Sequence, residues 1–234
     1  MRSEYLQTFM NFMLTGSIVG ITEGRVQGKP DQPRHSFLLK AENQSLPLCF
    51  NIDEETTLKL FHHPSSQLLI VGQPNKDSDS GFGLITVHLQ NSEIQINGNG
   101  IVTGPTGSTG PDQITAGSVT VTKRDKEIDV VSDDMHILIL VHEKHGKNFL
   151  WPVLKQRPSA NNTEGILAVK PVDYEVKPQS SQLKIHGQVF PSISYFAVDN
   201  SVSPPALTQC WLVDPDLVLQ RPLDEFLLHS KHVG

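Results

Sequence analysis

Clustered positive charge is missing from this chain: its 19 lysine and arginine residues are scattered, and no basic run is longer than Lys123-Arg124. Because nucleic-acid binding needs Lys and Arg gathered on one face, and the formal charge is -6 at pH 7, we expect no nucleic-acid partner. The sequence also lacks the roughly 18–20 consecutive apolar residues that a membrane-spanning helix requires. Its longest apolar-rich tract, residues 9–21, is interrupted by polar residues and a glycine. We therefore expect no membrane span.

The tract at residues 9–21 follows Arg2 and Glu4, and two interpretations of it stay open. One is a degenerate signal sequence with a short apolar region. The other is an amphipathic leader, or the ragged start of an incomplete gene. We divide the chain into a leader or ragged N-terminal segment, residues 1–26, and one domain, residues 27–234, which is long enough to bury a sizeable core.

Cysteine is scarce: among the 234 residues, Cys49 and Cys210 are the only cysteines. In a cytosolic protein they would be two buried thiols, whereas in a secreted chain they would form one disulfide between the start and the end of the domain. The chain also holds two glycosylation sequons, at Asn43 and Asn161. Composition by itself leaves the compartment open.

Helical periodicity is nearly absent from residue 36 onward, where apolar and polar residues alternate with the period of two that is typical of strands. The continuously apolar run Ile137–Val141 is expected to be a buried strand, and a weak helical pattern occurs at residues 223–230. The sequence predicts a mainly β protein, with sandwich or barrel-like antiparallel sheets, long loops and little helix. Strands are expected at residues 35–40, 46–52, 57–61, 67–71, 83–89, 93–97, 118–122, 127–131, 135–141, 165–169, 183–186, 194–198 and 209–213.

Catalytic and metal-binding motifs are also lacking. His142 and His145 are three residues apart, whereas the zinc-protease motif needs two histidines four apart on a helix. The segment Asp77–Gly81 lacks the further oxygen ligands of a calcium loop, and His62-His63-Pro64 indicates a turn. No Gly-x-Ser-x-Gly elbow or phosphate-binding glycine loop is present. We expect no catalytic residue, no metal site and no cofactor.

Two motifs are centred on the cysteines: Leu46–Asp53, which reads LPLCFNID, and Cys210–Val213, which reads CWLV. Both motifs resemble the C-terminal domain of the inter-alpha-trypsin inhibitor heavy chains. The resemblance spans roughly residues 30–230. Individually weaker matches follow in the same order at residues 58–61, 69–72, 82–89, 136–142, 165–168 and 183–187.

This resemblance implies a secreted protein in which Cys49 and Cys210 pair and Trp211 packs beside the disulfide. In the family, an Asp that begins an Asp-Pro-His-Phe motif forms an ester with chondroitin sulfate, and the ester is later transferred to hyaluronan. Here the same residue types occur in order at residues 31–37 but with residues between them, so Asp31 is a degenerate candidate for the processing or ester position. Ala168 also stands where the family has a second turn glycine.

Three functional hypotheses follow. The leading one is a secreted, non-catalytic heavy-chain-like module in hyaluronan metabolism and extracellular-matrix organisation, with hyaluronan or a chondroitin-bearing light chain as partner. Its link to serine protease inhibition comes from the family alone, because in that family a separate light chain, and not the heavy chain, inhibits the protease. The second is a generic extracellular β-rich interaction module, with other matrix proteins as partners. The third is a self-processing or ester-transferring enzyme acting at Asp31.

Overall fold

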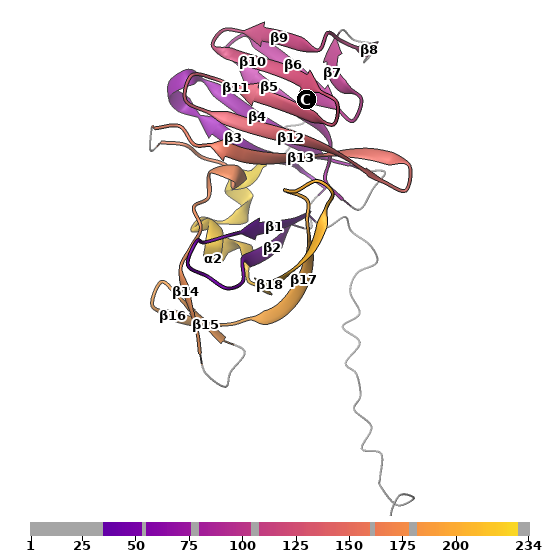
Figure 1. Ribbon diagram of the computed structural model, residues 1–234. Coiled ribbons are helices and arrows are strands. Elements are labelled where there is room, and N and C mark those ends of the chain that lie inside the picture. The colour runs from indigo at the N-terminus through magenta and orange to yellow at the C-terminus, as the bar shows by residue number, and fades with distance from the viewer. Residues whose placement is uncertain are drawn as a thin grey trace, which may run out of the picture. The chain divides into compact units, whose positions relative to one another are not determined.

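Strands dominate the protein (Figure 1). The computed structural model describes residues 35–52, 55–75, 80–103, 108–159, 162–177 and 182–228, and all of them fall in one compact unit of the chain, residues 31–234. The sheets are built almost wholly of antiparallel pairs, so the prediction of a mainly β fold with antiparallel sheets and little helix is confirmed. In this part of the chain, no helix has the length and apolar character needed to cross a membrane.

A four-stranded sheet brings together segments from the two ends of the described chain. Its order is β1-β2-β18-β17. The neighbours β2 and β18 run parallel, with Trp211 opposite Leu48 and Leu212 opposite Cys49, and the other two pairs are antiparallel. The strands are β1 (His35–Leu39), β2 (Leu48–Ile52), β17 (Ile193–Asp199) and β18 (Ala206–Leu212).

Within the described residues, the largest sheet has 12 strands and follows the path β19-β3-β4-β5-β13-β12-β11-β10-β9, with β6, β7 and β8 branching from β5. In β12 the residues Ile137–Leu140 are all buried, as expected for its apolar run. The strands are β3 (Thr57–His63), β4 (Leu68–Pro74), β5 (Phe82–Leu89), β6 (Ser92–Asn97), β7 (Gly100–Thr103), β8 (Ser108–Thr109), β9 (Gln113–Ala116), β10 (Val119–Arg124), β11 (Glu127–Val131), β12 (His136–Lys144), β13 (Lys147–Gln156) and β19 (Leu227–Leu228).

A small third sheet and four short helices complete the described chain. The sheet has the order β14-β15-β16, with strands β14 (Tyr174–Val176), β15 (Gln182–Ile185) and β16 (Gln188–Pro191). The helices are α2 (Pro215–Leu219) and the 3-10 turns η1 (Pro64–Ser66), η2 (Ile166–Ala168) and η3 (Leu223–Phe226). The prediction of a strand at residues 165–169 is wrong, because η2 occupies most of this run.

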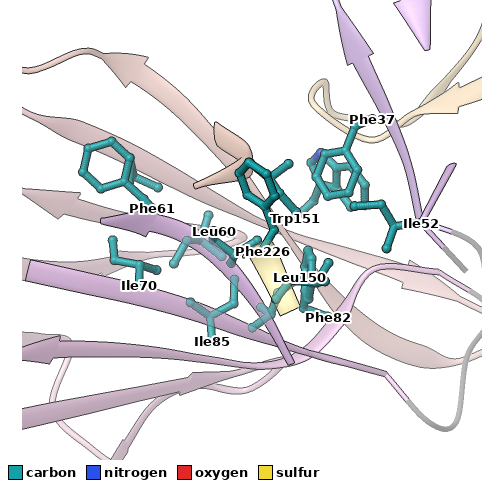
Figure 2. Packing of buried hydrophobic residues seen from close by; sticks show 14 of the residues in the cluster. Phe37, Ile52, Leu60, Phe61, Ile70, Phe82, Ile85, Leu150, Trp151 and Phe226 are labelled. Carbon is teal, nitrogen blue, oxygen red and sulfur yellow. The ribbon is translucent and has the colours of Figure 1, made fainter. Parts of the chain in front are cut away.

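One hydrophobic core links the four-stranded sheet to the large sheet (Figure 2). Trp151 on β13 lies 5.1 Å from Phe37 on β1 and 6.0 Å from Phe82 on β5, measured between ring centroids. Phe37 also stacks on Phe50 of β2. Because these large aromatic side chains are shared between the sheets, burying them stabilises both sheets together.

Candidate functional site

Cys49 and Cys210 form a buried disulfide between β2 and β18. The two strands are neighbours in the four-stranded sheet, which places the Cα atoms 5.8 Å apart, within the range that a disulfide spans. Both cysteines are fully buried and pack with Ala197 of β17, and Leu38, Tyr195 and Leu212 cover this small cluster. The pairing implied by the family resemblance is therefore present.

Trp211 does not pack beside this disulfide, so that expectation is wrong. Successive side chains point to opposite faces of a strand, and Trp211 therefore points away from the face that carries Cys210. It lies half-buried against the main core, on the same face as its strand partner Leu48.

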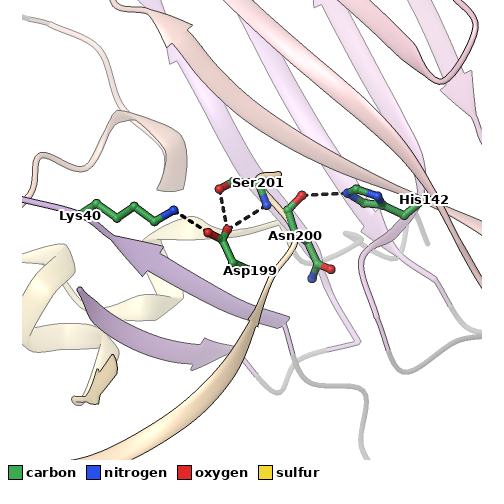
Figure 3. Close-up of polar contacts among 5 residues, drawn as sticks. All are labelled: Lys40, His142, Asp199, Asn200 and Ser201. Atoms are coloured by element: carbon green, nitrogen blue, oxygen red, sulfur yellow. Dashed lines mark hydrogen bonds and ion pairs between the residues drawn. The ribbon is translucent and has the colours of Figure 1, made fainter. Parts of the chain in front are cut away.

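The turn that follows β17 is held by polar contacts on both sides (Figure 3). Asp199 accepts hydrogen bonds from Lys40 at 2.5 Å and from the Ser201 hydroxyl at 2.5 Å. Burial by itself raises the pKa of the Asp199 carboxyl, but the hydrogen bonds from Lys40 and Ser201 outweigh burial and lower this pKa below its usual value. The turn is thus tied to the end of β1.

On the other side of this turn, Nε2 of buried His142 donates to the Asn200 carbonyl oxygen at 2.8 Å. Burial lowers the pKa of His142, the bond to Asn200 raises it, and nearby Lys126 lowers it, with a net decrease. His142 is therefore a neutral structural donor at pH 7. The His-x-x-His segment is a hairpin end, because His145 lies in the turn between β12 and β13 with a φ of 54°.

A cavity of about 210 Å³ lies between β1, β13 and the segment around η2. Its walls are mostly apolar and include Phe37, Trp151 and Ile166, and Lys40, Asp199 and Arg157 add charge. The Arg157 guanidinium donates from Nη1 to the Ala168 carbonyl at 2.7 Å and from Nη2 to the Val169 carbonyl at 2.8 Å. This arrangement combines an apolar chamber with a fixed cation.

A second, more open groove of about 490 Å³ is polar. Its wall includes the asparagines Asn75, Asn97, Asn99 and Asn148, together with Lys147. Two amides hold the wall in place, because Asn75 Nδ2 donates to the Asn148 carbonyl at 3.3 Å and Asn148 Nδ2 donates to the Gly98 carbonyl at 2.9 Å. Amide and ammonium groups of this kind can hydrogen-bond to the hydroxyl and carboxylate groups of a saccharide.

A charged cluster that the sequence did not predict surrounds Glu164. Lys59, His62 and Arg221 lie at 3.6, 3.7 and 3.6 Å from its carboxylate oxygens. Burial alone raises the pKa of Glu164, but Lys59, Arg221 and His62 together lower it below its usual value. The cluster fastens the segment before η2 to β3, where His62 and Glu164 also exchange two backbone hydrogen bonds, so it is structural.

The remaining predicted site residues do not come together. Asn43 is exposed in a turn, as a glycosylation acceptor needs to be, whereas Asn161 and Asp31 lie outside the described residues. His63 hydrogen-bonds to Ser66 beside the predicted turn at Pro64. Among the residues that the structure describes, no group of three or more His, Cys, Asp or Glu side chains is placed to hold a metal ion.

One face of the β17–β18 hairpin is apolar and exposed. Val198 lies opposite Leu207, and Phe196 lies two residues away on the same face. The exposed fractions of Phe196, Val198 and Leu207 are 59%, 47% and 71%. Large apolar side chains clustered in this way often mark a protein interaction surface.

Comparisons with known proteins do not add to these observations: protein-family models, curated proteins and solved structures gave no match.

Proposed function

We propose that this chain is a secreted, non-catalytic module of an inter-alpha-trypsin inhibitor heavy chain-like protein, associated with hyaluronan metabolism and extracellular-matrix organisation. The observation that carries the proposal is the buried Cys49–Cys210 disulfide. It joins the two motifs on which the family resemblance rests most, and disulfides of this structural kind form and persist outside the reducing cytosol. Serine protease inhibition attaches to the module through the family alone.

The compartment is tested by expressing the chain in mammalian cells behind a secretion signal and mapping its peptides without reduction. The proposal predicts one cross-linked peptide containing Cys49 and Cys210, with an N-glycan on the exposed Asn43. The same chain expressed in the cytosol is the matched control. Two freely alkylated thiols in the secreted, folded protein would contradict the secreted assignment.

The polar groove supports contact with hyaluronan, whose hydroxyl and carboxylate groups match the amides of the groove and the ammonium of Lys147. We expect the secreted protein to co-sediment with immobilised hyaluronan in a salt-dependent manner, and Lys147→Gln to weaken binding several-fold. Lys155→Gln is the matched control, because Lys155 is an exposed lysine at the other end of the same strand. Equal binding by both variants removes the groove from the proposal, and no binding by the unmodified protein removes hyaluronan.

Covalent transfer is tested separately by co-expression with the chondroitin-bearing light chain. A fragment ending at Asp31 would favour self-processing or ester transfer, and intact protein would exclude both for this chain.

The second candidate is a generic extracellular interaction module, which the exposed apolar face of the β17–β18 hairpin favours. In that case the protein would bind a purified matrix protein but no hyaluronan, and Leu207→Ser would weaken that binding. Binding of hyaluronan with unchanged affinity in Leu207→Ser would favour the first candidate.

A further inference from the structure

Within the part of the chain that the structure describes, Arg157 is a cation without a carboxylate partner. Among the described residues it takes part in no ion pair, whereas Lys40, the other cation in the cavity wall, is paired with Asp199. A guanidinium carries five N–H donors, and the carbonyls of Ala168 and Val169 occupy two of them. The cavity wall therefore has one uncompensated positive charge and unused donors.

The rest of the cavity wall is suited to an apolar body. Phe37, Trp151, Val153, Leu154 and Ile166 come from three different parts of the fold and leave a chamber of about 210 Å³ between them. This volume is below the roughly 300–1,000 Å³ that is usual for drug-sized ligands. The part of an occupant that lies inside the cavity is therefore small, a single short chain or one aromatic ring.

We propose that this cavity binds a small monocarboxylate with an apolar body, such as a medium-chain fatty acid, whose carboxylate pairs with Arg157. The apolar body replaces water against Trp151 and its neighbours, and the guanidinium supplies charge-assisted hydrogen bonds to the carboxylate. Its two carbonyl contacts hold the guanidinium in place before the ligand arrives, which lowers the entropic cost of binding. Arg157 itself is exposed, so the ion pair would form at the mouth of the cavity, with the apolar body of the ligand inside. This site is independent of the proposed matrix function.

The test uses the full chain and a series of probes of equal length: octanoate, octan-1-ol and octylamine. Titration calorimetry is expected to show octanoate binding about two- to fivefold more tightly than octanol, and octylamine binding more weakly than octanol, because an ion pair with an exposed guanidinium contributes about this much. Because the chain has two tryptophans, the Trp211→Phe variant leaves Trp151 as the only tryptophan, whose emission is excited selectively at wavelengths that tyrosine does not absorb. The emission of Trp151 should change as octanoate is added, and the affinity fitted to this change should equal the affinity measured by calorimetry.

Two variants locate the charge. Arg157→Gln should weaken octanoate binding about two- to fivefold and leave octanol binding unchanged, whereas Lys155→Gln, near the end of β13 and outside the cavity wall, should change neither. Leu207→Ser separates the cavity from the exposed hairpin face and should also change neither. Equal binding of octanoate and octanol to the unmodified protein overturns the proposal without depending on how any variant folds, and so does octanoate binding that Leu207→Ser abolishes.

Discussion

Acidification should destabilise this protein through His35, the residue that begins β1. His35 is fully buried, and its ring lies parallel to that of Phe82 at a centroid distance of 5.1 Å. Neither ring nitrogen has a hydrogen-bond partner among the described residues. Burial lowers the pKa of His35 from 6.5 to about 4, because the imidazolium form would lie in an apolar site without a counter-ion.

The size of the effect follows from this difference in pKa. The unfolded chain takes up a proton at His35 below pH 6.5, whereas the folded protein does so only near pH 4, so folding is favoured above pH 6.5 and loses stability as the pH falls. A pKa difference of one corresponds to about 1.36 kcal/mol. His35 therefore removes about 2 kcal/mol from the free energy of unfolding by pH 5 and about 3 kcal/mol below pH 4.

Urea unfolding at pH 7 and at pH 5 measures this loss, and His35→Phe is the informative variant. It keeps an aromatic ring against Phe82 and removes both unpartnered nitrogens, so its stability at pH 7 should stay within about 1–2 kcal/mol of the unmodified protein. Between pH 7 and pH 5 it should lose about 2 kcal/mol less than the unmodified protein. A smaller loss that remains in the variant is expected from His142, whose pKa is also lowered. If both proteins lose the same amount, His35 is not the buried neutral group described here.

Three further perturbations have defined outcomes. The double change Cys49→Ser and Cys210→Ser should lower the free energy of unfolding by roughly 5 kcal/mol on the chain-entropy model, and calorimetry in reducing agent should give the same loss for the unmodified protein. Gly165→Ala should cost about 2–4 kcal/mol in thermal unfolding, because its φ is +105° and a Cβ would lie 2.5 Å from a backbone oxygen of β3. Gly146→Ala, with φ +75° but nothing within 4 Å, should cost less, and equal losses would contradict the steric explanation. Asp199→Asn should lower the free energy of unfolding by about 1–3 kcal/mol at pH 7. Urea titrations should show the difference between the variant and the unmodified protein shrinking as the pH falls below about 3.8, because the carboxyl of Asp199 then becomes protonated. A difference that stays constant with pH would contradict this role of the carboxylate.

The strands whose sequences alternate clearly between apolar and polar residues could be predicted, whereas β13, the longest strand of the large sheet, could not. β13 carries Pro152 inside a nearly continuous apolar run, and a proline within such a run argues against a central strand. The structure accommodates Pro152 because β13 pairs with β5 only at Leu150, so at Pro152 it has β12 as its one neighbour. Which strands pair with β13 depends on the whole sheet, and the local pattern of apolar and polar residues carries no information about it.

The segment at residues 165–169 was mistaken for a strand because short apolar runs have no distinctive period. In the structure the positive φ falls on Gly165, while Ala168 is not among the residues with positive φ, so the missing second glycine causes no strain there. Helix α2 was predictable in principle: Asp214 caps it by accepting from the Asp216 amide, and Pro215 occupies its first turn.

Of the candidate sites, the cysteine pair could be predicted from the sequence, whereas the cavity and the polar groove could not. A chain with two cysteines allows one internal disulfide or two free thiols. The family resemblance favoured the disulfide, because it implied a secreted protein. The cavity could not be foreseen, because Phe37, Arg157 and Ile166 belong to separate segments that meet only through sheet packing. The unpaired state of Arg157 depends equally on which carboxylates fold near it.

The disulfide also sets how this protein would bear mechanical load. A pull that unravels the described chain from both sides would first detach β1 on one side and β19, η3 and α2 on the other, and would then reach Cys49 and Cys210, where the covalent link carries the tension from β2 to β18. From that point the segment between the two cysteines, which includes every strand of the large sheet except β19, feels no stretching force while the bond is intact. Reduction would release up to about 550 Å of extra contour length, so the thiol–disulfide balance of the surroundings would decide between a stiff tether and an extensible one.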